Sequence, residues 1–456
     1  MRFLILLLLF PYFVFTQDGF QVRHINIVDV KTGKIIPNQL VAIKGNKIVT
    51  ITKDVSVKNT LKSDIDGTNK YLIPGLWDMH YHGGTAPTRS TYFPLMLANG
   101  VTGARMMWGT KNDLLLRDSI RQGFIVAPRM VVASPLIDGA HSIFTTAVNT
   151  DDATRIPFII DSLHSLGYDF IKTYEFLPND VFHAISDYCR SHNIEFAGHT
   201  PIGMPIEEAS NAGLRSIEHL TGVTKGFSLW EDSLNKILPG KAMHMKDFAS
   251  FTETFFDNES YNFPFNEKKA EHVAATLRKN NTAVVPSISI YRGYLYNVDS
   301  LEKLPELQYF PKSTVKSWYN VRKAGIIDTN YLDNELRNLG FLYTHGVMIL
   351  AGTDALNSYT VHGFSLHNEL EWYVRAGLTP LAALQTATIN PALFLHKDKE
   401  MGTVEVNKIA DLVILHDNPL KDIRNTRAID AVIVNGRFLS RGELDDMLLK
   451  LKTRFQ

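Results

Sequence analysis

Apolar residues near both ends of the chain occur in the short runs that form β-strands. The amino-terminal part contains FQVRHINIVDV, QLVAIKG and KIVTITK, which the turn sequences TGK and KGNK separate. The far end carries two similar runs, ADLVILH and DAVIVNGRFL. Runs rich in Val and Ile and bounded by turn residues are typical of strands. We therefore expect strands at both ends of the chain.

The middle of the chain alternates short apolar strands with helical stretches. The run YDFIKTYE precedes a helical pattern over NDVFHAISDYCRSHN, and IEFAGHTP follows as another strand. A further helix, PIEEASNAG, leads to the strand LRSIEHLTG. This alternation predicts βα units and a parallel sheet. The interval from residue 74 to 394 holds enough units for a (β/α)8 barrel, which usually needs about 250 residues.

The stretch from Thr221 to about Thr344 is longer than two βα units need. Within it, NTAVVPSISIY is predicted to be the seventh strand. The surplus includes the aromatic-rich segments KDFASFTETFFDNESYNFPF and LPELQYFPKSTVKSWYNVRKAG. We expect this surplus to form loops and helices over the barrel mouth, where insertions often set substrate selectivity. An inert packing role is an equally open interpretation.

The amino terminus differs from the rest of the chain. MRFLILLLLFPYFVFTQ has one cation, Arg2, followed by an unbroken apolar stretch from Phe3 to Phe15. The stretch is short for a spanning helix and contains Pro11, which is typical of a signal peptide over residues 1–17. We expect a secreted or periplasmic protein with no stable membrane insertion after cleavage. A retained membrane anchor is the alternative.

Composition narrows the range of partners. The 456-residue chain carries 47 basic and 47 acidic residues, whereas nucleic-acid binders normally show a clear basic excess. Cys189 is the only cysteine, so the chain forms no internal disulfide and relies on its core. We expect a small-molecule or dipeptide substrate and no nucleic acid, and a homo-oligomer is compatible with this composition.

Polar side chains follow the apolar runs at the ends of the predicted strands. In YLIPGLWDMHYHGG, His80 and His82 face the same side of a strand, with Asp78 on that side as well. Strand ends deliver catalytic groups to one face of a barrel. A salt bridge, a core histidine or a helix cap explains any one such residue, but not six together. The six are His80, His82, Lys172, His199, His219 and Asp354.

Four imidazoles and a carboxylate suit borderline metals, and zinc is the ion that we expect. Lys172 fits this set only if its amine has reacted with carbon dioxide, because an ammonium group repels a metal whereas a carbamate can bridge two. Charge counting favours two divalent ions, facing the carbamate, Asp354 and a bridging hydroxide. Two metals sharing one hydroxide supply a nucleophile at neutral pH and polarise a scissile carbonyl.

The motifs GLWDMHYH, FIKTY, GHT, IEH and AGTDA resemble the signature positions of the binuclear metal-dependent amidohydrolase superfamily. The tail sequences LTPLAALQTATINPALFL, GTVEVNKIADLVIL and VIVNGR are similar to its imidazolonepropionase-like and prolidase-like branch. The resemblance runs from Phe20 to about Leu439. It implies an α/β fold, with a distorted (β/α)8 TIM barrel over residues 74–394. A small β-sandwich domain would combine residues 18–73 and 395–440, and we place a C-terminal helix over 441–456.

The resemblance also implies a role for each ligand. The two histidines of the HxH motif and Asp354 would hold the more buried metal. The histidines of strands five and six would hold the other, and N6-carboxylysine at Lys172 would bridge both. Asp354 would also take a proton from the hydroxide and deliver it to the leaving amine.

Two features separate this chain from the deaminases of the superfamily. They carry a glutamate three residues after the strand-five histidine, where this chain has Ile202, and they lack the bridging lysine. We therefore expect an amidohydrolase that cleaves a C–N bond, of a dipeptide or an N-acyl amino acid, by attack of a metal-bridging hydroxide. A phosphotriesterase or lactonase uses the same ligands and stays open. A non-catalytic binding barrel would be indicated by a missing ligand, and none is missing.

Three further side chains are candidates for catalysis and substrate contact. His141, in LIDGAHSIF, would polarise the substrate carbonyl or bind its carboxylate. Tyr174 lies two residues past Lys172 on the same strand face, and His362 lies in YTVHGF beyond the strand-eight aspartate. A loop or packing role competes for each. A cationic clamp for a free carboxylate would favour a peptidase, and the candidates are Arg89, Arg105 and Arg292.

Overall fold

The computed structural model describes residues 19–55, 64–83, 91–243, 263–295, 298–323 and 329–455. The signal peptide that we predict over residues 1–17 lies outside these ranges. Within them, every helix is too short or too polar to cross a lipid bilayer.

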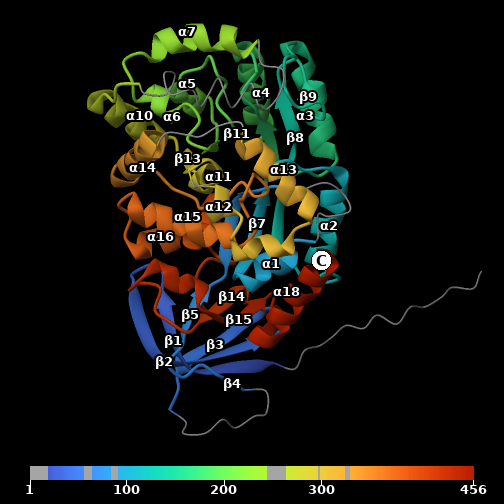
Figure 1. Cartoon of the computed structure of the whole chain (residues 1–456), viewed down its shortest axis with the longest axis vertical. Helices are drawn as coiled ribbons and strands as arrows, with labels where there is room; N and C mark the ends of the chain where they lie inside the picture. The colour runs from blue at the N-terminus through green and yellow to red at the C-terminus, as the bar shows by residue number, and fades with distance from the viewer. Residues whose placement is uncertain are drawn as a thin grey trace, which may run out of the picture.

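Strands from both chain ends form one sheet of eight strands (Figure 1). They are β1 (Phe20–Asp29), β2 (Lys34–Lys44), β3 (Lys47–Lys53), β4 (Ile65–Asp66), β5 (Tyr71–Pro74), β14 (Leu412–Leu415), β15 (Ile429–Val434) and β16 (Arg437–Ser440). The order is β16-β15-β14-β5-β1-β2-β3, with β4 paired to β1. Because β14 lies antiparallel beside β5, the sheet joins the two ends of the chain. Alternate apolar residues such as Val22 and Leu72 are buried in its own small core.

The second sheet is the barrel. Its parallel strands are β6 (Leu76–Tyr81), β7 (Val101–Met106), β8 (Arg129–Asp138), β10 (Phe170–Thr173), β11 (Phe196–Gly198), β12 (Ser216–Glu218) and β13 (Ala283–Val285). They follow one another in chain order, and the short β9 (Val148–Asn149) pairs with β8. The predicted fold class, a distorted barrel with a small sheet domain, is therefore confirmed.

An irregular eighth strand, residues 348–355, closes the barrel between β13 and β6. The amide of Leu350 donates to the carbonyl of Val284 on β13 at 2.9 Å. On the other side, the amide of Met79 on β6 donates to the carbonyl of Ala351 at 2.8 Å. The segment thus joins the first and last strands, although its pairing is too irregular to form a full strand.

Helices surround the barrel, and α4 shows why the sequence forms them. The outer helices are α1 (Phe93–Ala98), α2 (Lys111–Arg121), α3 (Ile156–Ser165), α4 (Asn179–His192), α5 (Ile206–Asn211), α15 (Phe364–Arg375), α16 (Pro380–Thr386) and α17 (Ile389–Phe394). In α4, Val181, Ile185 and Cys189 recur at four-residue spacing and are buried. The helix ends at Asn193, whose left-handed φ of 54° stops it.

The long stretch after β12 folds on both sides of β13. Before it come α6 (Val223–Gly226), α7 (Glu231–Ala242) and α10 (Glu267–Lys279). After it come η2 (Ile288–Tyr291), α11 (Arg292–Leu295), α12 (Val298–Leu301), η3 (Pro305–Tyr309), α13 (Lys312–Lys323) and α14 (Thr329–Thr344). Most of the first aromatic-rich segment lies outside the described residues.

The second aromatic-rich segment has a packing role. It forms η3 and α13, and its Phe310 and Trp318 share a buried cluster with Tyr92 and Leu451. Tyr92 precedes α1, and Leu451 belongs to the final helix, α18 (Arg441–Phe455). This segment therefore fixes the C-terminal helix to the barrel, and the packing interpretation applies to it.

A buried side-chain contact secures the closure of the barrel. The hydroxyl and the amide of Thr353, in the eighth strand, both donate to the carboxylate of Asp78 on β6, at 2.6 and 3.0 Å. Burial raises the pKa of Asp78 to about 7, although these hydrogen bonds act in the opposite direction. The predicted position of Asp78 beside the HxH histidines thus serves to hold strand eight.

Replacing Thr353 with Val should lower the free energy of unfolding by about 1–3 kcal/mol, because the buried carboxyl of Asp78 loses a donor. Urea denaturation followed by circular dichroism measures this. The control is Thr344→Val, at an exposed position where we expect a change within about 0.5 kcal/mol. Equal effects of the two substitutions would show that the contact does not secure the closure.

Candidate metal centre

The predicted ligands meet at the carboxyl end of the barrel strands. A cavity of about 980 Å³ opens there, and all six predicted ligands line it. Their convergence follows from the topology, because each ends or follows a parallel strand of one closed sheet. The six are His80, His82, Lys172, His199, His219 and Asp354.

Asp354 lies at the centre of the group. Its Oδ1 is 2.8 Å from Nε2 of His82 and 3.4 Å from Nε2 of His80. Its Oδ2 is 3.6 Å from Nε2 of His219. The His199 ring continues the cluster, with its centroid 4.9 Å from that of His219. One ligand atom each from His80, His219 and Asp354 lie within 4.8 Å of one another, which is close enough to bind a single ion.

Lys172 projects into the same cluster from β10. Its side chain is 1% exposed, and among the described residues its Nζ has no hydrogen-bond partner. Burial lowers the pKa of Lys172 to about 8. An unpaired buried amine is costly. The side chains around Lys172 therefore fit a metal centre. The metal would contact both the imidazoles and the side chain of Lys172.

The protonation states suit metal binding. Burial lowers the pKa of His219 to about 3, and it lowers those of His80 and His199 well below their usual value. These imidazoles are therefore neutral at pH 7, which is the form that binds a metal. For Asp354, burial acts to raise the pKa, but the nearby His219, His82 and Lys172 outweigh it, so the pKa is lowered and the carboxylate stays ionised.

Two glutamates that the sequence reasoning missed orient the ligands. Nδ1 of His80 lies 2.7 Å from Oε2 of Glu218, and Nδ1 of His199 lies 3.0 Å from Oε1 of Glu175. Each carboxylate accepts the Nδ1–H and so directs Nε2 toward the centre. A signal was present in the sequence, because both glutamates stand beside ligands in the motifs IEH and KTYE.

Arg105 supports the centre from below and does not act as a substrate clamp. Its guanidinium donates to Oε1 of Glu218 at 2.9 Å and to Oγ of Ser216 at 3.0 Å. The side chain is buried and does not line the cavity at the carboxyl end of the strands. Of the other two candidates, Arg292 pairs with Glu306 at 2.8 Å outside the cavity, and residue 89 lies outside the described ranges.

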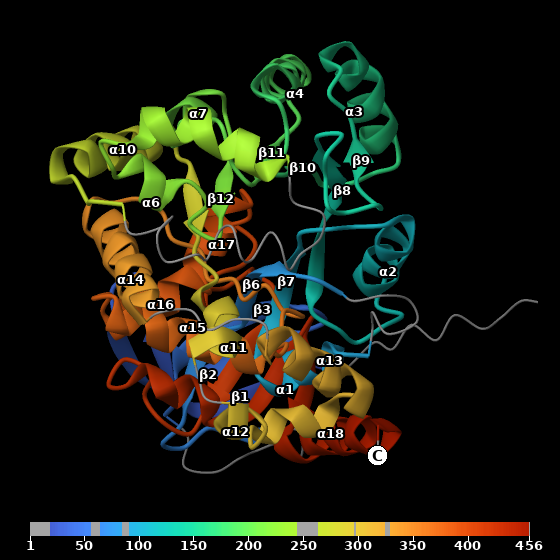
Figure 2. The same cartoon turned by 45° about the horizontal axis from the view of Figure 1, so that its top comes forward.

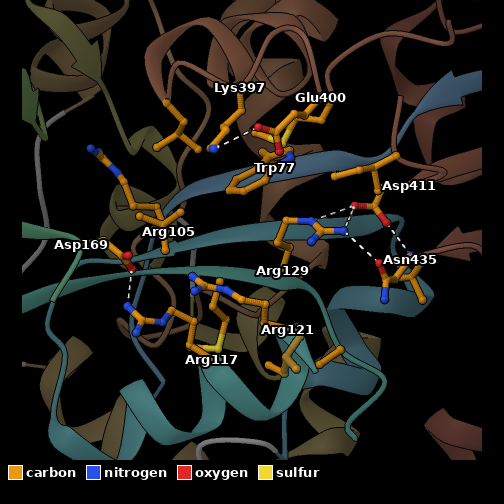
Figure 3. Close-up of a pocket in the computed structure, with 18 of the residues that line it drawn as sticks. Trp77, Arg105, Arg117, Arg121, Arg129, Asp169, Lys397, Glu400, Asp411 and Asn435 are labelled. Atoms are coloured by element: carbon orange, nitrogen blue, oxygen red, sulfur yellow. Dashed lines mark hydrogen bonds and ion pairs between the residues drawn. The ribbon is translucent and has the colours of Figure 1, made fainter. Parts of the chain in front are cut away.

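Arg105 instead lines a second cavity at the amino end of the strands, facing the sheet domain (Figure 3). This cavity measures about 1050 Å³. Its walls carry ion pairs from Arg117 to Asp169 at 3.0 Å and from Arg129 to Asp411 at 3.1 Å, so much of its charge is compensated. The candidate metal ligands all lie at the opposite end of the barrel.

His141 is not brought into the catalytic cavity. It is exposed in a turn after β8, where the amide of Ala140 donates to Asp151 at 2.8 Å and that of Ser142 to the Gly139 carbonyl at 3.0 Å. This turn holds the histidine outside the residues that line the cavity. The structure therefore gives no support to its predicted contact with substrate.

Tyr174 lies where the sequence predicted, in the wall of the cavity. Its ring stacks on His199 with centroids 4.2 Å apart and packs edge-on against Phe144 at 5.3 Å. Burial raises the pKa of Tyr174 well above its usual value, so the phenol stays protonated and can donate.

His362 lies behind the site and does not line the cavity. Its Nε2 is 2.9 Å from the carbonyl oxygen of His82, and its ring stacks on Tyr92 with centroids 4.9 Å apart. Burial lowers the pKa of His362 to about 4, so the neutral ring donates through Nε2. His362 therefore positions His82. The structure does not place it where the predicted contact with substrate would occur.

The fold and this site define a (β/α)8 barrel with a histidine-rich metal centre. The family model described as the amidohydrolase family matches residues 71–439, and the chain belongs to that family. The match supports a metal-dependent hydrolase that acts on carbon–nitrogen bonds, and proteins of this family generally hold a binuclear metal centre.

Curated relatives include adenine deaminases at 22% to 37% identity, the latter an enzyme of Clostridium botulinum matched over 396 residues, which cover 74% of this chain and 61% of that protein. An adenine deaminase of Desulforamulus reducens is 22% identical over 422 residues, which cover 92% of this chain and 57% of that protein. The chain thus spans about three fifths of the length of the curated relatives.

Solved structures share the fold. A putative prolidase from Bifidobacterium longum is similar with a TM-score of 0.69 at 21% identity, covering 95% of this chain and 99% of that one. A Xaa-Pro dipeptidase with bound methionine gives 0.66 at 20% identity, covering 93% and 100%.

Replacing Glu218 with Gln should weaken metal binding by about 10–100-fold, because the amide cannot accept from both His80 and Arg105. Competition with a chelating dye measures the affinity. Glu195→Gln is the control, since Glu195 pairs with Arg215 away from the centre. Equal affinities in the two variants would contradict a role for Glu218 in orienting His80.

Proposed function

We propose that the protein is an exported amidohydrolase that cleaves the amide bond of a dipeptide or an N-acyl amino acid. It would use two divalent ions, zinc being the expected metal, and a carboxylated Lys172. The export rests on the signal peptide predicted over residues 1–17. The observation that carries the catalytic part is the buried amine of Lys172, which lies among four imidazoles and has no hydrogen-bond partner within the described residues.

Carboxylation would convert the buried amine of Lys172 into an anion that can bind metal. The neutral amine adds to carbon dioxide, a C–N bond forms, and one proton is released, which leaves a carbamate anion. This exchanges an unpaired buried donor for an anion with two oxygens, and anionic oxygen suits divalent metals. The family's generally binuclear centre supports this assignment.

The resemblance to the amidohydrolase superfamily implies a division of the ligands between the two ions. His80, His82 and Asp354 would hold one ion, and His199 and His219 the other. When bound, such ions lower the pKa of water and polarise a carbonyl oxygen.

Asp354 would move the proton in this reaction. Nδ2 of Asn357 donates to its Oδ2 at 2.5 Å, which fixes the orientation of the carboxylate. The ionised carboxylate would accept a proton from the attacking water and pass it to the amine nitrogen as the C–N bond breaks. The products are a carboxylate and an amine.

The walls of the cavity indicate a substrate with an apolar portion. Trp108, Phe144, Leu220 and Ile290 line it, and it is larger than the scissile amide requires. Ile202 lines it too, at the position where deaminases of the superfamily carry a glutamate. That apolar replacement supports hydrolysis of an amide over deamination of a purine.

A hydrolysis screen tests the proposal. The full chain, prepared with zinc and bicarbonate, is offered dipeptides including Xaa-Pro, N-acyl amino acids, lactones, phosphotriesters and adenine. Cleavage of a dipeptide or an N-acyl amino acid with the highest kcat/KM is the expected result. Faster turnover of a lactone, a phosphotriester or adenine would overturn the proposal.

Replacing Lys172 with Ala should remove activity, because the bridging anion is lost. The variant should also bind less metal than the wild type, for which we expect about two ions per chain. Elemental analysis measures the metal. Added propionate should restore part of both, since its carboxylate can occupy the vacated space. Lys279→Ala, on an exposed helix end, should retain both properties. Wild-type turnover in the Lys172 variant would refute the bridging role.

Replacing Asp354 with Asn should reduce kcat by about 10²–10⁴-fold, because the amide cannot accept the proton. Steady-state kinetics at matched metal content separates this effect from metal loss. Asp398→Asn, at an exposed position, provides the matched control. A kcat equal to that of the control would refute proton transfer by Asp354.

A further inference from the structure

A second carboxylate lines the catalytic cavity apart from the candidate metal ligands. Glu335 belongs to α14, which lies beside α6 at the edge of the barrel (Figure 2). The residue is 2% exposed and contributes to the cavity wall. A buried carboxylate without a partner is strongly disfavoured, so its role needs an explanation.

One oxygen of Glu335 is anchored and the other is not. The hydroxyl of Thr224, on α6, donates to Oε1 at 2.8 Å, and Nδ2 of Asn338 donates in turn to that hydroxyl at 2.9 Å. Oε2 has no hydrogen-bond partner among the described residues. The anchored oxygen fixes the side chain, and the second oxygen is left to accept from a ligand.

Glu335 and the candidate metal ligands line the same cavity. Both Glu335 and Asp354 line the cavity, together with Tyr291. Burial raises the pKa of Tyr291 well above its usual value, and the charges of Glu335 and Asp354 add to this effect. The charges of both carboxylates therefore affect the phenol of Tyr291, which lines the cavity with them.

Burial raises the pKa of Glu335 to about 8, although the hydrogen bond from Thr224 and the charge of Arg337 act to lower it, so a cation that paired with the free oxygen would favour the ionised form. Lys225 lines the same cavity, but its Nζ donates to the carbonyls of Ile202 and Met204 at 2.9 and 3.1 Å. The guanidinium of Arg337 lies over the ring of Phe265, 4.7 Å from its centroid. No ion pair joins Glu335 to either cation in the described part of the chain.

We propose that Glu335 recognises a cationic nitrogen of the substrate, carried by a free amino terminus or by a basic side chain. This rests on the proposed function, since the metal centre would act on the amide of the same molecule. Oε2 would accept one N–H of the cation while Thr224 holds Oε1. The site would then select substrates by the charge of this nitrogen.

Binding of two matched probes tests the proposal without any turnover. Pentylguanidinium and pentylurea have nearly the same shape, and only the first is a cation. Isothermal titration calorimetry on the metal-loaded full chain should show the cation binding about 10–150-fold more tightly, as expected for a charge-assisted hydrogen bond. A ratio near one in the wild type would overturn the proposal, and this measurement needs no variant.

Two variants assign the preference to one residue. In Glu335→Gln, which keeps the acceptor for Thr224, the affinity ratio should fall to about one. Glu271→Gln, exposed on α10, should keep the wild-type ratio. If Glu335→Gln kept that ratio too, the charge of Glu335 would play no part. A loss of affinity shared equally by both probes would indicate a neutral, hydrogen-bonding Glu335 and would also overturn the proposal.

Kinetics distinguish the two sources of the cation. Leucyl-phenylalanine against 4-methylpentanoyl-phenylalanine tests the amino-terminal ammonium, and 4-methylpentanoyl-arginine against 4-methylpentanoyl-citrulline tests a basic side chain. In one pair, kcat/KM for the cation should exceed that for its neutral partner, and Glu335→Gln should abolish this difference through KM. Equal values within both pairs would overturn the role in selection. Failure of the wild type to cleave any amide would defeat the proposed function, while the probe-binding result would still decide the role of Glu335.

Discussion

The closure of the barrel by residues 348–355 is the constraint on which the site depends. This irregular segment pairs with β6 and β13, and the buried contact between Asp78 and Thr353 holds it in register. Asp354 follows directly, so the same contact places its carboxylate against the HxH histidines. Without closure, the first and last strands would separate, and a centre built from both could not form.

Buried hydrogen bonds and ion pairs connect the candidate metal centre to residues inside the barrel. Burial keeps the imidazoles of His80, His199 and His219 neutral, while Asp354 remains ionised among them. Glu218 holds His80 and is itself held by Arg105, whose side chain reaches the cavity at the amino end of the strands. His80, Glu218 and Arg105 thus form one chain of contacts. Among the described residues, the amine of Lys172 has no hydrogen-bond partner, and it marks the position where carboxylation is proposed.

The parts that the sequence predicted are those that topology dictates. A residue at the end of a parallel strand must face the rim of a closed barrel, and the six ligands and Tyr174 all line the cavity as a result. His141 and His362 lie in loops, whose course depends on turns and packing that local pattern does not reveal. The supporting role of Arg105 was missed for a related reason, since the sequence of β7 gives no sign of which end of the barrel its arginine side chain faces. The role of Glu335 depends on the packing of α14 against α6, which connects residues about a hundred positions apart.

Anomalous X-ray diffraction from the protein, grown and crystallised with zinc and bicarbonate, tests the central claim most directly. Data collected above and below the zinc absorption edge locate the ions independently of any assay. The account predicts two peaks about 3.5–4 Å apart, with electron density continuous from Nζ of Lys172 to an added carboxylate between them. A single peak, or an unmodified Lys172 pointing away from the histidines, would contradict it.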